Sequence, residues 1–236
     1  MRFLFFSLLI CSLKASLAQS PNSLNLMPVP KSIVMNNGRF ALNPGFTVSV
    51  KTERADSLIY QAANRMFKTL NRRTGLYFLQ ENINSRFNSD TAGLVIHVQK
   101  QFEMKIGIDE SYQLEVRNSQ VRLEANTSIG ALRGMETLLQ LLALDESGYY
   151  FPALTIQDAP RFAWRGLMID VARHFIPIDV IKRNIDAMAA VKMNSLHLHL
   201  SDDQGFRVES KRFPLLQEKG SKGKYYTQAE IRDLVD

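Results

Sequence analysis

The sequence has a single cysteine, Cys11, which lies in the first apolar stretch of the chain. Ile10 precedes it, where a lipid-anchor signal would carry a small residue, which argues against a lipoprotein. The chain also has one tryptophan, Trp164, and no collagen-like or low-complexity tract. A chain of 236 residues is long enough for one large or two modest domains. Because cysteine is scarce, a hydrophobic core must stabilise these domains without disulfides.

A strong charge of either sign is also missing. The formal net charge is +6, and removing Arg2 and Lys14, which lie in the first 18 residues with no acid beside them, leaves +4. The other basic residues are scattered and are not interleaved with aromatics. This distribution favours a solvated surface over a nucleic-acid site.

Long hydrophobic runs are absent except near the N-terminus. Arg2 precedes an apolar run from Phe3 to Leu13, and small residues follow up to Ala18. This order is typical of a secretory signal peptide, whereas a membrane helix needs about 20 apolar residues. We predict that residues 1–18 are a signal peptide cleaved near Ala18. The protein is then expected to be exported to a periplasmic, extracellular or lysosome-like compartment, without a membrane span.

Residues 19–158 mix strand and helix patterns. Alternating or clustered apolar residues predict strands over residues 46–50, 94–98, 112–116 and 121–125. Helical spacing predicts one helix from Ile59 to Leu70, ending at Gly75, and a second from Ile129 to Leu142. Thr127 or Ser128 is expected to cap the second helix, and the same pair completes a glycosylation sequon at Asn126 that matters only in a eukaryotic host. The segment is predicted to be an α+β domain, a sheet with helices on one face.

The pattern changes after residue 158. Residues 166–171 form a nearly continuous apolar run, as in a strand buried on both faces. A predicted helix over 179–192 and a strand over 195–200 follow, and the capping box 227–230 opens another helix. Alternating strands and helices indicate the start of a parallel (β/α) domain over residues 159–236. Since a (β/α)8 TIM barrel takes about 250 residues, we interpret the chain as an incomplete copy of a longer protein.

Polar residues follow both of these strands. Arg173 follows the first, and Asp202 and Asp203 follow the second, at the strand ends where barrels carry their active sites. Arg173 either pairs with a surface acid or holds hydroxyls or a carboxylate with its planar fork of donors. The two aspartates either form a solvated turn or contribute one carboxylate to a site, because adjacent residues on an extended backbone point to opposite sides.

Two histidines lie on the second strand of this pair. His197 and His199 share a face, about 6.6 Å apart along the strand. A His-x-His pair beside aspartates resembles the ligands of metal-dependent barrel hydrolases, but zinc or iron needs at least three protein ligands. His174 is the only other histidine near a strand end. We therefore favour structural histidines, with a metal site and a substrate or proton-relay role as the alternatives.

Several motifs, taken in order, resemble one known family. WRGLMIDVARHF (164–175), HLHLSDDQGF (197–206) and TQAEI (227–231) resemble the opening of the catalytic barrel of glycoside hydrolase family 20, the β-N-acetylhexosaminidases. Upstream, LMPVPKSI (26–33), GALRGMETLLQLL (130–142) and IQDAPRFAWRG (156–166) are similar to the non-catalytic α/β domain that precedes this barrel and to the junction between them. The resemblance covers nearly all of the chain after residue 18. It implies a non-catalytic α/β domain over 19–158 and the first βαβ units of a catalytic TIM barrel over 159–236.

The resemblance also implies a function. It indicates an exo-acting hydrolase that removes terminal GlcNAc or GalNAc from glycans or chitin oligosaccharides, with no metal or other cofactor. Arg173 corresponds to the arginine that grips ring hydroxyls of the terminal sugar. Asp202 corresponds to the aspartate that holds a histidine from later in the barrel, and this histidine contacts the acid/base glutamate. Asp170 and Asp203 are expected to be structural.

The mechanism implied by the resemblance is substrate-assisted and retaining. The 2-acetamido oxygen of the sugar attacks the anomeric carbon, an aspartate orients the acetamido group, and the adjacent glutamate protonates the leaving oxygen. The Asp-Glu dipeptides of this sequence, Asp109-Glu110 and Asp145-Glu146, both fall in the first domain. We therefore expect these 236 residues to be inactive by themselves. The alternative is a non-catalytic carbohydrate-binding protein with a degenerate barrel.

Overall fold

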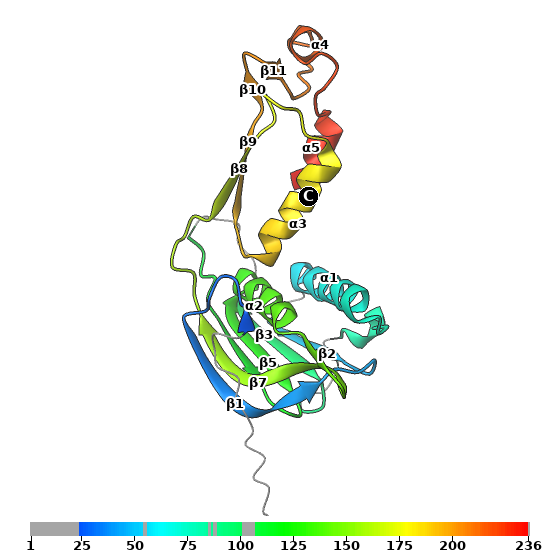
Figure 1. Cartoon of the computed structure of the whole chain (residues 1–236), viewed down its shortest axis with the longest axis vertical. Helices are drawn as coiled ribbons and strands as arrows, with labels where there is room; N and C mark the ends of the chain where they lie inside the picture. The colour runs from blue at the N-terminus through cyan, green and yellow to red at the C-terminus, as the bar shows by residue number, and fades with distance from the viewer. Residues whose placement is uncertain (1–23, 54–55, 85, 87–88, 101–106, 236) are drawn as a thin grey trace, which may run out of the picture.

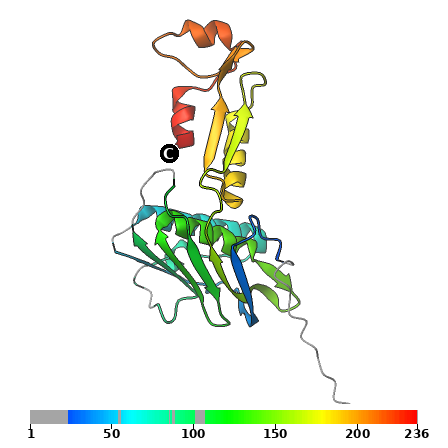
Figure 2. The same cartoon turned by 90° about the vertical axis from the view of Figure 1, so that its left-hand side faces the viewer.

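The computed structural model of the chain describes residues 24–53, 56–84, 86, 89–100 and 107–235. The predicted signal peptide lies outside these residues. Within them, no helix is both long and apolar enough to cross a membrane. The chain forms a broad sheet domain and a narrower βα part that extends away from it (Figures 1 and 2).

The sheet domain is built on seven strands in the order β1-β7-β4-β5-β3-β2, with β6 paired to β7. Strands β2, β3 and β5 are parallel to one another, and the remaining pairs are antiparallel. Their bounds are β1 (Ser32–Ala41), β2 (Val48–Thr52), β3 (Leu94–Lys100), β4 (Tyr112–Val116), β5 (Val121–Thr127), β6 (Ala143–Asp145) and β7 (Gly148–Asp158). The four strands predicted from the sequence are present, with ends shifted by no more than two residues. Strands β1, β6 and β7 were not predicted.

Two helices cover one face of this sheet, as predicted: α1 (Ser57–Thr74) and α2 (Ser128–Gln140) (Figure 1). The Asp56 side chain caps α1 by accepting hydrogen bonds from two backbone N–H groups of its first turn. Gly75 ends α1 in the left-handed region (φ 71°), where glycine avoids the steric penalty of a Cβ atom. Thr127 caps α2 by accepting from the N–H of Gly130. A short 3-10 helix, η2 (Gln80–Asn82), follows α1.

The core of this domain lies between the helices and the sheet. In β5, residues alternate strictly between buried and exposed, so one face of the strand packs under α2. Five phenylalanine rings form a connected cluster with centroid separations of 5.5–6.5 Å. They are Phe40, Phe46, Phe67, Phe78 and Phe151, and all are buried. Burial of these rings supplies much of the hydrophobic stabilisation of a domain without disulfides.

The second part begins with a parallel βαβ unit made of β8 (Gly166–Asp170), α3 (Ile178–Ala190) and β9 (Ser195–His199). A hairpin of β10 (Ser201–Asp202) and β11 (Gly205–Phe206) follows, and then α4 (Leu215–Gly220) and α5 (Gln228–Val235). Val171, Ile181 and Tyr226 form a small buried core between these elements. The predicted capping box of α5 is present, since the N–H of Glu230 donates to Thr227 Oγ1 and the N–H of Thr227 donates to Glu230 Oε2.

The expectation that the strand over 166–171 is buried on both faces is wrong for the described residues. Every residue of β8 is exposed or partly exposed, and the Met168 side chain is 58% exposed. In the described part of the chain, β8 pairs only with β9. A two-stranded sheet offers too few neighbours to bury the apolar side chains on both faces of β8. The hairpin β10–β11 and the helix α4 were also not predicted.

Candidate active site

Arg173 and Asp202 lie together beyond the carboxyl ends of β8 and β9. The two strands are in parallel register, and their last residues, Asp170 and His199, are paired. The chain continues from these ends into the turn with Arg173 and the hairpin with Asp202, so both side chains meet at one edge of the sheet. Arg173 Nη2 lies 2.6 Å from Asp202 Oδ2. The proximity expected from the sequence is therefore confirmed, and the roles of the two residues stay predictions.

Asp170 and His199 complete a cluster of four polar side chains. Asp170 accepts from the Arg173 backbone N–H at 3.0 Å and pairs with the Arg173 guanidinium. His199 Nε2 lies 3.1 Å from Asp202 Oδ2. The Arg173 side chain is 58% exposed while the Asp202 carboxyl is 25% exposed, so the cluster opens to solvent on the arginine side.

Hydrogen bonds keep this cluster charged. The pKa of Asp202 lies below its ordinary value, mainly because the backbone N–H of Asp203 and the His199 ring bond to it. The pKa of Asp170 is lowered in the same way by the backbone N–H and the guanidinium of Arg173. The hydrogen bond to Asp170 and the charge of Asp202 raise the pKa of Arg173. The site therefore presents one cation held by two carboxylates.

Two members of this cluster were not part of the site predicted from the sequence. Asp170 was expected to be structural, and its i, i+3 spacing to Arg173 places it where it supports that side chain. His199 was grouped with His197, but only His199 contacts Asp202, while His197 is exposed. Among the residues that the structure describes, no group of three or more His, Cys, Asp or Glu side chains could hold a metal ion.

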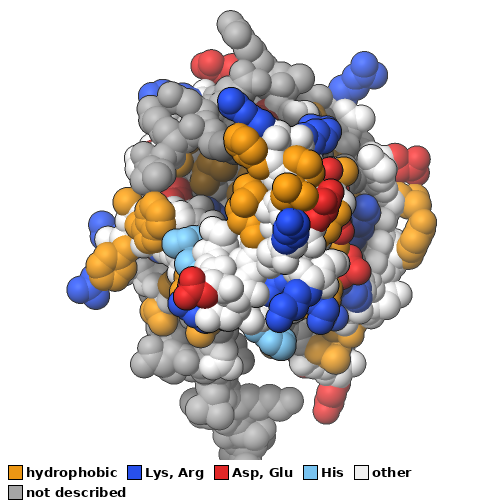
Figure 3. All heavy atoms as spheres, turned by 90° about the horizontal axis from the view of Figure 1, so that it is seen from above, with side chains coloured by type: hydrophobic (Ala, Val, Ile, Leu, Met, Phe, Trp, Pro, Cys, Tyr) orange, Lys and Arg blue, Asp and Glu red, His pale blue; other side chains and the backbone are white. Residues whose placement is uncertain are grey.

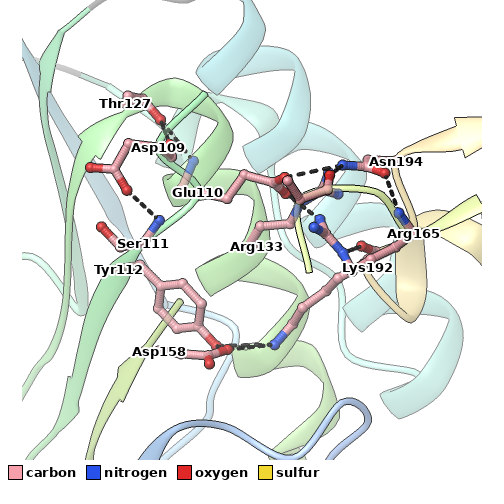
Figure 4. A network of polar contacts seen from close by, with 12 residues as sticks. Asp109, Glu110, Ser111, Tyr112, Thr127, Arg133, Asp158, Arg165, Lys192 and Asn194 are labelled. Carbon is pink, nitrogen blue, oxygen red and sulfur yellow. Dashed lines mark hydrogen bonds and ion pairs between the residues drawn. The ribbon is translucent and has the colours of Figure 1, made fainter. Parts of the chain in front are cut away.

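A second polar network joins the sheet domain to the start of β8 (Figure 4). Glu110, just before β4, has a side chain that is only 4% exposed. It pairs with Arg133 of α2 (Nε to Oε2, 2.7 Å), with Arg165 just before β8, and with Asn194 just before β9 (Nδ2 to Oε1, 3.2 Å). Burial raises the pKa of Glu110, but the hydrogen bonds from Arg165 and Arg133 outweigh this and leave the pKa below its ordinary value. Glu110 is thus a fixed anion at the junction, which agrees with excluding the Asp109-Glu110 dipeptide as an acid/base pair.

Lys192 forms the other half of this network. It follows α3 with a left-handed backbone (φ 61°), and its side chain is buried. Lys192 Nζ donates to Tyr112 Oη at 3.0 Å and pairs with Asp158 Oδ2 at 3.4 Å, while its carbonyl accepts from Arg165 Nε at 2.8 Å. Burial lowers the pKa of Lys192 and raises that of Tyr112. These contacts hold the segments before β8 and β9 against the sheet domain.

Two hollows and an apolar patch lie outside the cluster at Arg173 and Asp202. A cavity of about 620 Å³ at the junction is lined by Glu110, Lys192 and Phe162, among others. A polar hollow of about 470 Å³ is lined by residues of the sheet, such as His97 and Gln157. Figure 3 views the molecule from the end that carries α4, where hydrophobic side chains lie beside charged ones. Phe213, Leu215 and Leu216, at the start of α4, are 45–58% exposed.

Comparisons with known proteins match both parts of the chain. Residues 162–236 match the family described as glycosyl hydrolase family 20, catalytic domain, and residues 26–141 match the family described as beta-acetyl hexosaminidase like. A beta-hexosaminidase 1 of Arabidopsis thaliana is 34% identical over an alignment 251 residues long, gaps included, which covers 98% of this chain and 46% of that protein. A beta-hexosaminidase of Vibrio furnissii is 33% identical, over 90% of this chain and 35% of that protein.

Solved structures agree with these matches. A chitobiase from Flavobacterium johnsoniae is 46% identical with a TM-score of 0.86, over 92% of this chain and 33% of that chain. A Streptomyces plicatus beta-hexosaminidase in complex with its product GlcNAc has a TM-score of 0.74 at 29% identity, over 89% of this chain and 42% of that chain. The chain thus spans between a third and a half of these relatives. The match to beta-acetyl hexosaminidase like lies on the sheet domain, and the match to the catalytic domain covers the part from β8 onward. The chain therefore has an N-terminal α+β domain followed by the start of a (β/α)8 barrel. The chain belongs to glycoside hydrolase family 20.

Proposed function

We propose that the protein is an exo-acting β-N-acetylhexosaminidase that hydrolyses terminal GlcNAc or GalNAc from glycans or chitin oligosaccharides. The observation that carries this proposal is the pairing of Arg173 with Asp202 at the carboxyl ends of β8 and β9. The Streptomyces plicatus relative holds GlcNAc as its product, which supports a terminal N-acetylhexosamine as the substrate here.

Arg173 supplies a fork of donors for two neighbouring ring hydroxyls. Its guanidinium is held by Asp170 at one terminal nitrogen and by Asp202 at the other, and the side chain is 58% exposed, so its orientation is set before a ligand binds. Asp202 accepts hydrogen bonds and remains a carboxylate, which suits it to hold a protonated or polarised histidine in an acid/base relay. No metal or cofactor is part of this proposal.

The chemistry requires a general acid and an acetamido-orienting carboxylate in addition to these residues. Of the Asp-Glu dipeptides in the sequence, Glu110 is buried between two arginines, and Asp145 lies at the end of β6 in the sheet domain. We therefore propose that these groups come from a longer polypeptide that completes the barrel, and that the 236 residues alone do not turn over substrate. Residues 1–18 support export of the protein, which N-terminal sequencing of the secreted form tests.

The test is hydrolysis of 4-nitrophenyl N-acetyl-β-glucosaminide by the full-length protein with its barrel complete. Arg173→Ala should lower kcat/KM roughly tenfold or more for each hydrogen bond from the charged group that is lost. Arg117→Ala is the matched control, because Arg117 is 63% exposed at the far end of β4. Binding of GlcNAc without hydrolysis would favour the carbohydrate-binding alternative, and hydrolysis unaffected by Arg173→Ala would remove Arg173 from the site.

A further inference from the structure

Arg207 is a buried cation whose hydrogen bonds all go to backbone carbonyls. It follows β11, and only 6% of the residue is exposed. Its guanidinium and Nε donate to five carbonyl oxygens at 2.7–3.3 Å, and no carboxylate partner is present among the described residues. The acceptors are the carbonyls of Val171, Ala172, Gln204, Ser221 and Lys224.

The surroundings of Arg207 are shaped to hold its planar head. A Cβ atom on Gly205 would lie 2.3 Å from Arg207 Cζ, so that position must be glycine for the guanidinium to fit. The Phe175 ring centroid lies 6.0 Å from Arg207 Cζ. Burying a charge is costly unless it is fully hydrogen-bonded. Here five carbonyl dipoles take the place of water, and each must stay in position for the charge to remain satisfied.

These carbonyls belong to the two segments that carry the candidate site. Val171 and Ala172 directly precede Arg173, and Arg207 binds both carbonyls. Gln204 follows Asp202 by two residues, in the turn of the β10–β11 hairpin. One guanidinium therefore joins the backbone behind Arg173 to the backbone behind Asp202. Its bonds to Ser221 and Lys224 attach both segments to the loop after α4.

We propose that Arg207 is the positioning residue of the site, which holds Arg173 and Asp202 in register for the sugar without touching it. This inference rests on the proposed function. A static cross-link of this kind matters because a misplacement of about 1 Å at a reacting centre can lower the rate about 10²-fold.

The test uses steady-state kinetics of the full-length protein with Arg207→Ala and Arg207→Lys. Both variants should raise KM and lower kcat, with kcat/KM down about 10²-fold for alanine and less for lysine, since lysine keeps a charge but loses the planar fork. A variant that only reduced the folded fraction would lower the apparent kcat and leave KM unchanged. Arg212→Ala is the control, because Arg212 is exposed on the following loop.

Two further measurements separate the possible outcomes. Guanidinium ion, added to Arg207→Ala at a concentration well below the denaturing range, should restore kcat/KM with saturation, whereas ammonium should not. Crystal structures of wild type and the lysine variant should differ in the backbone around residues 171–173 and 202–204, and this comparison does not depend on activity. Wild-type protein that cleaves no N-acetylhexosaminide would contradict the proposed function alone. An active wild type with unchanged kinetics in both variants, or an unmoved backbone, would overturn the role of Arg207.

Discussion

Replacing Glu110 by glutamine should destabilise the protein by several kcal/mol, although the two side chains have the same shape. Glu110 is 4% exposed between Arg133 and Arg165, which are each 14% exposed. The substitution leaves two largely buried guanidinium groups without their anion. Breaking a buried ion pair by removing one partner costs about 3–5 kcal/mol. We expect about 3 kcal/mol, near the lower limit, because both guanidinium side chains still reach some water.

The dependence on pH distinguishes this effect from a packing defect. Since the pKa of Glu110 in the folded protein lies below its ordinary value of 4.5, the stabilisation by the carboxylate is fully present above pH 4.5. It is lost as the pH falls through the folded pKa, where Glu110 becomes protonated and resembles glutamine. The difference between wild type and Glu110→Gln should therefore be constant from neutral pH down to 4.5 and shrink below it.

Thermal unfolding followed by circular dichroism measures this difference. A loss of about 3 kcal/mol corresponds to a Tm lower by roughly 6–12 °C for a chain of this size. Glu115→Gln is the matched control, because Glu115 pairs with the 63% exposed Arg117 and should contribute less than about 1 kcal/mol. A Glu110→Gln variant whose Tm falls no more than that of Glu115→Gln, or whose loss persists unchanged at low pH, would refute the reasoning.

Three other substitutions test separate parts of the structure. Asp202→Asn should lower the kcat of the full-length protein roughly 10²-fold, because asparagine cannot supply the carboxylate that holds a histidine in the proposed relay; an unchanged kcat would contradict this. Gly134→Ala should lower the Tm, against the usual gain for alanine in a helix, because its Cβ would lie 2.2 Å from Leu123 Cδ1 and overpacking costs about 1–3 kcal/mol. Thr227→Ala should destabilise α5 by about 1 kcal/mol through loss of the capping box, which urea unfolding measures; no change would show that the cap contributes nothing.

Helices α1, α2, α3 and α5 and strands β2, β3, β4 and β5 could be predicted because their signals are local. Helix α1 has a capping aspartate, an apolar stripe and a terminal glycine within a single stretch of sequence. In strand β5, buried and exposed residues alternate along the whole strand. The proximity of Arg173 and Asp202 also followed from a general rule, since parallel strands bring their carboxyl ends to the same edge.

Strands β1 and β7 could not be predicted because their local signals favour other structures. Strand β1 contains Asn-Asn-Gly, a sequence that indicates a turn. In the structure these three residues lie between Met35 and Arg39, where the pairing of β1 with β7 shifts its register. Strand β7 contains Pro152, which argues against a central strand. The structure places Pro152 opposite Arg39, beside that irregularity and beyond the residues that pair with β4. Tertiary pairing therefore tolerates a proline that the isolated segment would not.

The polar network around Glu110 and Lys192 was missed because its members are far apart in the sequence and none of them has a local signature. Glu110 and Arg165 are 55 positions apart, and Lys192 and Tyr112 are 80 apart. Lys192 even adopts a left-handed backbone that its residue type disfavours. The periodicity of apolar residues identifies the side chains that pack in a core. A buried ion pair between distant residues produces no periodic pattern in the sequence, so it cannot be found in this way.

The network around Glu110 and Lys192 lies between the two hydrophobic cores, which do not contact each other. The buried apolar residues form two separate clusters, one in the sheet domain and one around Val171, Ile181 and Tyr226. The junction between them includes Glu110, Lys192 and the bond from Gln140 Nε2 to the carbonyl of Ala190 at 2.6 Å. Apolar contacts are non-directional, while charged hydrogen bonds specify distance and angle. The junction is thus suited to fix how the first barrel strands are oriented on the sheet domain.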